Sequence, residues 1–221
     1  MNMKNLGGAL CAAAILSLGT LMPANASIIG AVGGVINSGG PGFGNLADTY
    51  NQNGLSANYI SGVTAFDSFV ASTTHTSVFS GYEWFSNQGT TTASVTYDLG
   101  DTTLINKFAL WNEESSGIGL LDLLVSTDGV SFTSLLSGLT PTDNPLADYG
   151  ADVFGFATTG FRYLQMNMSG CPQNNPGTFA ACAIGEVAFN KVAAVPVPAG
   201  GVLLFGGIAA LAALRRRNKA L

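Results

Sequence analysis

An alternation of apolar and polar residues, interrupted by turn residues, constrains the fold of this chain most strongly. Residues 94–99 and 162–168 both carry apolar side chains at every second position. Because successive side chains of a strand point to opposite faces, this period of two predicts half-buried β-strands. Asp128-Gly129 stands between two further apolar runs, and this dipeptide predicts a β-hairpin.

The other apolar runs predict an all-β domain. Turn residues follow these runs at short intervals, Gly100-Asp101 among them, and no clear helical period separates them. This pattern favours a β-sandwich or jelly roll over residues 59–190. Residues 27–58 are rich in Gly, Asn and Ser and are expected to be loop with one or two short strands. The remaining strands are predicted at residues 105–111, 120–127, 132–136 and 183–189.

The first 26 residues have the three parts of a secretory signal peptide. Lys4 gives a positive start, residues 6–21 form an apolar core, and Ala24 and Ala26 make a small-x-small cleavage site. We therefore expect residues 1–26 to form an apolar signal helix and the mature protein to be exported.

The other end of the chain predicts a transmembrane helix. Residues 197–214 are 18 positions without a charge, within the roughly 17–25 residues that span a bilayer. The basic cluster that follows is expected to stay on the cytoplasmic side. Residues 191–194 are a short linker to this tail, which comprises residues 195–221. Its marked features are two prolines and three arginines: Pro196, Pro198, Arg215, Arg216 and Arg217.

The order of these features resembles the PEP-CTERM sorting signals of Gram-negative bacteria, in the variant with a Val-Pro-x-Pro-Ala opening. This chain has Pro196-Val197-Pro198 where the name-giving motif has Pro-Glu-Pro. The resemblance implies an exosortase-type sorting protease as partner and cleavage near the prolines. It also implies passage through the inner membrane to the cell surface or extracellular matrix. An ordinary single-span anchor is the alternative interpretation.

The charge between the two ends excludes some classes of partner. Residues 27–194 contain all thirteen acidic residues and three of the eight basic ones, which gives a net charge of −10. This balance argues against nucleic acid, whose phosphates require clusters of Lys and Arg, and disfavours docking on anionic lipid. It is compatible with a soluble surface protein or with binding of divalent cations.

Two cysteines remain after removal of the signal peptide, Cys171 and Cys182. An even count in an oxidising compartment predicts a disulfide. A metal-binding pair is the alternative, but neither cysteine has a histidine or second cysteine at ligand spacing. The polar segment between them contains prolines and a glycine that can turn the chain back.

A second resemblance concerns the β-rich region and rests on five segments: residues 95–100, 105–112, 125–132, 162–166 and 184–189. In their order and spacing these segments resemble the discoidin or coagulation-factor C-type domain, a galactose-binding-like jelly roll. By position, the resemblance implies a structural calcium that joins Asp67 in an early loop to Glu186 before the last strand. Carboxylate oxygens suit this ion. The alternative is a surface aspartate and a glutamate bound to loop amides.

The segment Tyr82-Glu83-Trp84 is the candidate ligand-binding site. Aromatic rings can stack on the apolar C–H faces of sugars, while carboxylates accept hydrogen bonds from sugar hydroxyls. In the resembling family the matching tryptophan belongs to the core, which is the alternative for Trp84. Trp111, at a strand end, is expected in the core.

Catalytic motifs are lacking in the sequence. His75 lies in a polar segment and is expected to be a solvated loop residue, and no Gly-x-Ser-x-Gly or zinc-helix motif occurs. Glu113 and Glu114 are adjacent at a strand end and are expected to point in opposite directions rather than form a catalytic pair. The sequence therefore predicts a protein that is not an enzyme.

These observations favour an exported, non-enzymatic binding module of the cell surface or matrix. Carbohydrate is the expected ligand class, with extracellular polysaccharide as partner. The alternative is a structural or adhesive surface protein that binds another protein. A glycan-active enzyme is the third and least supported interpretation.

Overall fold

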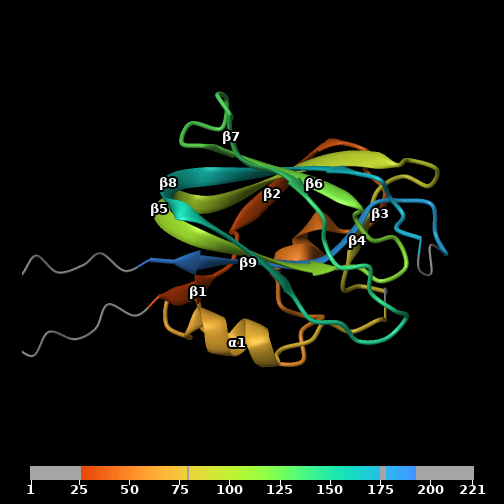
Figure 1. The fold of residues 1–221 in the computed structure, drawn as a ribbon, viewed down its shortest axis with the longest axis horizontal. Helices are drawn as coiled ribbons and strands as arrows, with labels where there is room; N and C mark the ends of the chain where they lie inside the picture. The colour runs from red at the N-terminus through yellow and green to blue at the C-terminus, as the bar shows by residue number, and fades with distance from the viewer. Residues whose placement is uncertain (1–25, 79, 175–177, 193–221) are drawn as a thin grey trace, which may run out of the picture. The chain divides into compact units, whose positions relative to one another are not determined.

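The computed structural model describes residues 26–192 except Phe79 and residues 175–177. The predicted tail, and all but the last residue of the predicted signal peptide, lie outside the described residues. In the described part, no helix is long and apolar enough to cross a bilayer. The elements are β1 (Ser27–Ile29), β2 (Gly33–Ser38), β3 (Phe43–Gly44), η1 (Leu46–Tyr50), α1 (Phe66–Ser72), β4 (Trp84–Phe85), β5 (Thr92–Asn112), β6 (Leu120–Ser126), β7 (Thr133–Leu139), β8 (Asp152–Ser169) and β9 (Ala183–Lys191) (Figure 1).

The strands form an antiparallel β-sandwich, as the sequence predicts. β5 and β8 are 21 and 18 residues long, and each contributes one half to either layer. In one layer the first half of β5 pairs with β2 and with β8, which continues to β6 and β7. In the other layer the second half of β5 pairs with β9, which continues to β1 and β4.

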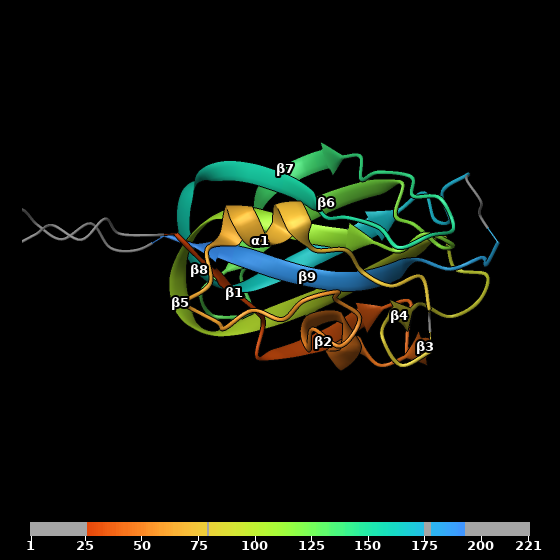
Figure 2. The ribbon, with the colours of Figure 1, turned by 90° about the horizontal axis from the view of Figure 1, so that it is seen from below.

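The two long strands bend together where they pass between layers. Their register shifts between Asp98 and Thr103, and Gly100 has a φ of +86°. Figure 2 shows both strands curving round at one end of the sandwich. The turn predicted at Gly100-Asp101 is therefore a bend inside one continuous strand. Such bends need residues that tolerate a left-handed backbone, which glycine does.

The core between the layers confirms the predicted alternation. In β8, Leu164 and Met166 are fully buried, while Gln165 between them and Asn167 after them are half-buried. These two apolar side chains pack with residues of the opposite layer such as Phe189. The predicted hairpin at residues 128–129 is also present, because β6 pairs antiparallel with β7.

A second core lies on the outer face of β9 and contains the only α-helix that the structure describes. Phe66, Phe69 and Val70 of α1 are buried and pack with Trp111, which confirms the core position of that tryptophan. Figure 2 shows α1 lying along β9. Its indole Nε1 donates to Thr73 O at 3.1 Å. The sequence did not predict α1, because two helical turns are too short to display a clear 3.6-residue period.

Residues before position 59 belong to the same sheet. β1 pairs with β9, β2 with β5 and β3 with β4, so this stretch contributes three short strands where one or two were expected. β2 lies at the edge of its layer and exposes much of its apolar surface, including 63% of Val35. An edge strand of this kind has no clear alternation of burial, which explains why the sequence predicts too few strands before residue 59.

Candidate functional site: an aromatic cleft beside buried carboxylates

A cleft of about 490 Å³ opens beside β3 and β4. These two strands lie beside the start of β9 (Figure 1). Its walls come from β3, β4, the turn after β5, the segment before β9 and the loops that carry Ser77 and Leu146, and most of its surface is apolar. Phe85 and Phe179 meet edge to face with ring centroids 5.8 Å apart. The lining residues are Phe43, Ser77, Phe85, Glu114, Ser115, Leu146, Thr178 and Phe179.

The wall that carries Phe179 is fixed to the rest of the domain. The predicted disulfide is present and joins Cys171 to Cys182, whose Cα atoms are 5.0 Å apart. The Ser116 hydroxyl donates to Phe179 O at 2.7 Å, and the Phe179 amide donates to Ser115 O. The ring therefore projects from a segment that is held at several points.

Two glycines allow β3 and β4, which form the opposite wall of the cleft, to pack closely. Gly42 and Gly44 both have a φ of +76°, a conformation that other residues adopt at a cost. A Cβ at Gly42 would overlap the backbone carbonyl of Phe85, and one at Gly44 would overlap that of Glu83. The two glycines therefore permit the close approach of β3 to β4 that places Phe43 and Phe85 beside the cleft.

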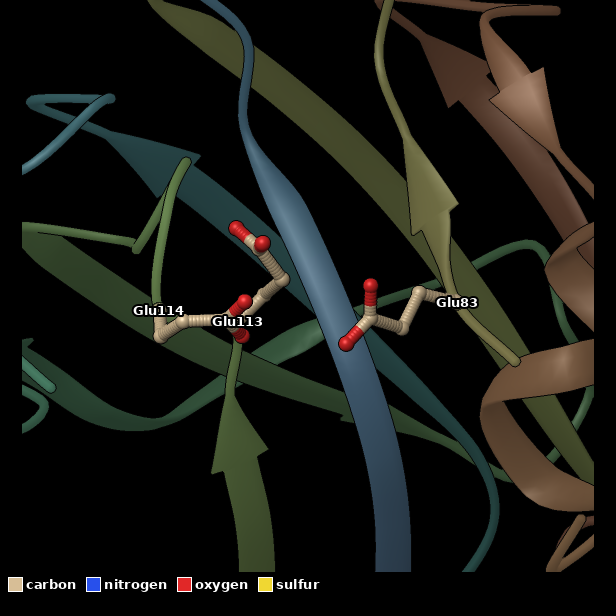
Figure 3. Close-up of side chains that lie close together, drawn as sticks. All are labelled: Glu83, Glu113 and Glu114. Atoms are coloured by element: carbon tan, nitrogen blue, oxygen red, sulfur yellow. The ribbon is translucent and has the colours of Figure 1, made fainter. Parts of the chain in front are cut away.

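Three carboxylates meet beside this cleft: Glu83, Glu113 and Glu114. One oxygen of each lies within 4.8 Å of the others, and all three residues are buried. In the view of Figure 3, Glu83 extends toward the β9 ribbon from one side, and Glu113 and Glu114 lie close together on the other. The strand pairing explains why the three carboxylates lie together. Ile184 of β9 has Trp84 of β4 on one side and Asn112 of β5 on the other. Glu83 precedes that tryptophan, and the other two follow that asparagine. We call these three residues the carboxylate cluster.

The members of the carboxylate cluster differ in their hydrogen bonds. Glu113 accepts from the Ser115 hydroxyl at 2.5 Å and from the Ser116 amide. Glu83 Oε1 accepts from the Tyr149 hydroxyl at 2.7 Å. Glu83 Oε2 and Glu114 Oε2 have no hydrogen-bond partner in the part of the chain that the structure describes.

Burial raises the pKa of all three carboxyl groups. Desolvation is the largest cause, and it raises the pKa of Glu83 to about 9 and that of Glu114 to about 7. The negative charge of Glu113 adds to both shifts, and burial also raises the pKa of Glu113 itself. A site of this kind favours either protons or a cation over three bare charges.

His75 is linked to the carboxylate cluster through the Tyr149 hydroxyl. The prediction that His75 is a solvated loop residue was wrong. It is fully buried, with Nδ1 3.0 Å from the Tyr149 hydroxyl and 2.9 Å from Thr76 O. Burial lowers the pKa of His75 to about 4. Bridges to Leu55 and Tyr149 draw this segment inward, and Gly54 provides the space for the ring. These long-range pairings are invisible in a local polar sequence.

The candidate ligand residues Tyr82, Glu83 and Trp84 take three different positions. Trp84 is fully buried and donates through Nε1 to Pro41 O at 2.9 Å, so it occupies the core position that was the alternative. Glu83 joins the carboxylate cluster. Tyr82 lines a separate hollow of about 290 Å³, together with residues such as Asp148.

The structure places Asp67 and Glu186 with different partners. Asp67 is 70% exposed and forms an ion pair with Lys107 at 2.6 Å. Glu186 is fully buried, and its Oε2 accepts from the Gln52 amide at 3.1 Å. Lys107 pairs in the sheet with a β9 residue four positions from Glu186, about 13 Å along the strand. This arrangement does not fit a calcium ion shared by the two carboxylates.

Glu113 and Glu114 do not point in opposite directions, so that expectation was wrong. They follow Asn112, the last residue of β5, and alternation between faces applies only inside a strand. However, Glu114 is the only acid or base among the described residues that line the cleft. Hydrolysis of a glycosidic bond generally needs two carboxyl groups that flank the substrate, and this cleft presents one.

Sequence reasoning missed the aromatic lining of the cleft. Phe43, Phe85 and Phe179 are separated by long stretches of sequence, and only the fold brings them together. One signal was available for Phe179: an isolated aromatic residue in a polar segment between two cysteines. Such residues are often displayed for binding rather than for packing.

No protein-family model matches this chain, and no curated protein matches it. Among solved structures, a chitosan-binding module from a chitosanase/glucanase of Paenibacillus sp. IK-5 aligns with 16% identity and a TM-score of 0.47. That alignment covers 73% of this chain and 95% of the module.

Two other solved structures are similar to this chain, and each is also a binding module. The CBM32 module of AlyQ in complex with 4,5-unsaturated mannuronic acid has 18% identity and a TM-score of 0.44, over 73% of this chain and 96% of that one. A pectin-binding carbohydrate-binding module has 22% identity and a TM-score of 0.40, over 52% and 75% respectively. At these TM-scores the likeness is partial, and the assignment as an all-β sandwich rests on the strand pairing of the chain itself.

Proposed function

We propose that this protein is an exported, non-catalytic module that binds a saccharide in the aromatic cleft. The observation that carries the proposal is the cleft lining. Phe179 and Phe85 form one apolar surface, Phe43 is 57% exposed at its side, and the carboxylate of Glu114 lies on the wall.

Each part of this lining suits a sugar ring. The C–H face of a pyranose is apolar and packs on an aromatic ring, while its hydroxyls need acceptors such as a carboxylate. Serine and threonine hydroxyls from Ser77, Ser115 and Thr178 also line the cleft and offer both donors and acceptors.

The net charge of the protein disfavours one class of saccharide, the polyanionic chains. The described residues contain three basic and thirteen acidic side chains, a net charge of −10. Long-range repulsion disfavours polyanionic chains, and Glu114 would oppose a uronate in the cleft itself. We therefore propose a neutral or amino-sugar polysaccharide as the ligand class.

Export and sorting are part of the same proposal. The disulfide supports an oxidising compartment, and the predicted signal peptide and tail support export followed by exosortase-dependent sorting to the cell surface or matrix. Mass spectrometry of the protein recovered from the cell surface tests this. A mature C-terminus near Pro196–Pro198 is expected, whereas an intact Leu221 would indicate an ordinary membrane anchor.

Binding is tested on a polysaccharide panel with neutral, cationic and anionic members, using the purified full chain. We expect retention on a neutral or amino-sugar polysaccharide, and Phe179→Ala should weaken it about tenfold because an aromatic contact contributes about 0.5–1.5 kcal/mol beyond its area. Tyr82→Ala is the matched control, since Tyr82 lines the other hollow. Loss of binding in the Tyr82 variant with retention in the Phe179 variant would contradict the proposed site.

A protein ligand is the second candidate, and exposed apolar side chains favour it. Phe43, Leu146 and Val78 are each more than half exposed, and the first two line the cleft. Apolar rims of this kind also fit protein partners. A panel on which no saccharide is retained would favour this adhesive function.

A further inference from the structure

The carboxylate cluster lies where the protein supplies no compensating charge. The basic residues of the described part are Lys107, Arg162 and Lys191. The first two form ion pairs with aspartates outside the cluster, and Lys191 ends β9, seven positions from the strand residue beside the cluster. At the rise of a strand, those seven positions are about 23 Å. No described Lys or Arg side chain therefore balances the negative charge of the cluster, and the basic nitrogen that lies near it is Nδ1 of His75, 3.5 Å from Glu83 Oε1.

Two oxygens of the carboxylate cluster also lack hydrogen bonds to the described residues. Glu83 is fully buried and Glu114 is 5% exposed, and each has an Oε2 atom with no partner among the described residues. Leaving a buried carboxylate oxygen without a partner is costly, because it loses its hydration and gains nothing in return. These unpartnered atoms belong to two of the three side chains that each bring one oxygen within 4.8 Å of the others (Figure 3).

We propose that Glu83, Glu113 and Glu114 bind a divalent cation, with calcium as the favoured ion. Calcium takes six to eight oxygen ligands at about 2.4 Å, so two oxygens on opposite sides of the ion are about 4.8 Å apart. One oxygen of each glutamate lies within 4.8 Å of the others. Zinc prefers nitrogen and sulfur ligands, and magnesium demands a tighter octahedral arrangement. Because Glu114 also lines the cleft, the ion has a path from solvent.

The bound ion has a structural consequence for the cleft. Glu113 is tied to Ser115 and Ser116, and these two residues hydrogen-bond the backbone of Phe179. An ion on the cluster would therefore stiffen the turn that fixes the aromatic wall. Ion binding itself does not depend on the proposed saccharide function.

Calcium binding is measured on the purified full chain after removal of metal by a chelator. We expect a single calcium by titration calorimetry, a higher melting temperature with calcium than with chelator, and a weaker response to magnesium. Terbium, which substitutes for calcium, should luminesce on excitation of Trp84, which adjoins Glu83. Glu83→Gln and Glu114→Gln should each weaken calcium binding by at least about tenfold, since affinity follows the charge count of the ligands.

Glu186→Gln is the matched control. Glu186 is also fully buried with an unpartnered oxygen, but it lies outside the carboxylate cluster. This variant and Asp67→Asn should keep the calcium response. The proposal is overturned if the chain binds no calcium, which would mean that the cluster holds protons only. It is also overturned if Glu186→Gln loses binding while Glu114→Gln retains it.

The variants Glu114→Gln and Phe179→Ala keep the outcomes separate. If Glu83→Gln fails to fold, Glu114→Gln at the cleft decides, because its side chain is the least enclosed of the three. Phe179→Ala should keep its affinity for calcium whether or not saccharide binding is lost. A failure of the cation site is thus distinguishable from a failure of the saccharide site.

Discussion

Opening the disulfide between Cys171 and Cys182 should destabilise the domain and loosen the cleft. The two cysteines are 11 residues apart in sequence and buried, and Phe179 lies between them. The bond therefore restrains both the unfolded chain and the segment that carries one wall of the cleft.

The loop length sets the size of the effect. In the chain-entropy relation, closing a loop of about 12 residues removes about 9.5 cal/mol/K from the unfolded chain, which is about 2.8 kcal/mol at 25 °C. For a domain of this size, about 1 kcal/mol shifts the melting temperature by about 2–4 °C. We therefore expect the melting temperature to fall by about 6–11 °C when the bond is opened.

Differential scanning calorimetry of the full chain with and without a thiol reductant measures this shift. The double variant Cys171→Ser/Cys182→Ser should melt near the reduced protein and ignore the reductant. An oxidised and a reduced protein with the same melting temperature would refute the reasoning. So would a double variant that still responds to reductant.

The remaining predictions concern the backbone, the core and an ion pair. Gly42→Ala should destabilise the chain clearly more than Gly62→Ala in urea unfolding: both glycines have positive φ, which alone costs about 1–2 kcal/mol, but only at Gly42 would the new Cβ overlap a carbonyl. Trp111→Phe should cost about 2–3 kcal/mol of unfolding free energy, because it leaves a cavity and an unpaired carbonyl. The hydrogen bond from Arg162 lowers the pKa of Asp98, so its stabilisation is present above the ordinary pKa of 3.8 and is lost as pH falls below it. Asp98→Asn should flatten the pH dependence of the melting temperature in that acidic range, and an unchanged slope would contradict this.

The parts of the fold that follow a local period could be predicted from the sequence. The alternation of residues 162–168 was visible because this second half of β8 is buried on one face only, so every second residue is apolar. The hairpin between β6 and β7 was visible because its turn chemistry lies in two adjacent residues. The disulfide followed from the count of cysteines and the expected compartment.

The candidate site could not be predicted in the same way, because distant segments build it. His75 is buried through bridges to Leu55 and Tyr149, neither of which is its neighbour in sequence. The carboxylate cluster joins residues about thirty positions apart, since the start of β4 and the end of β5 lie on either side of β9. The two adjacent glutamates after β5 were misjudged because the strand ends one residue before them. A period of two carries no information past that point.

The measurement that tests the central claim most directly is a crystal structure of the protein with the saccharide that the polysaccharide panel selects. We expect a sugar ring packed on Phe179 in the aromatic cleft, with a hydroxyl bound to the carboxylate of Glu114. A saccharide seated in the hollow lined by Tyr82 and Asp148, with the aromatic cleft empty, would contradict it.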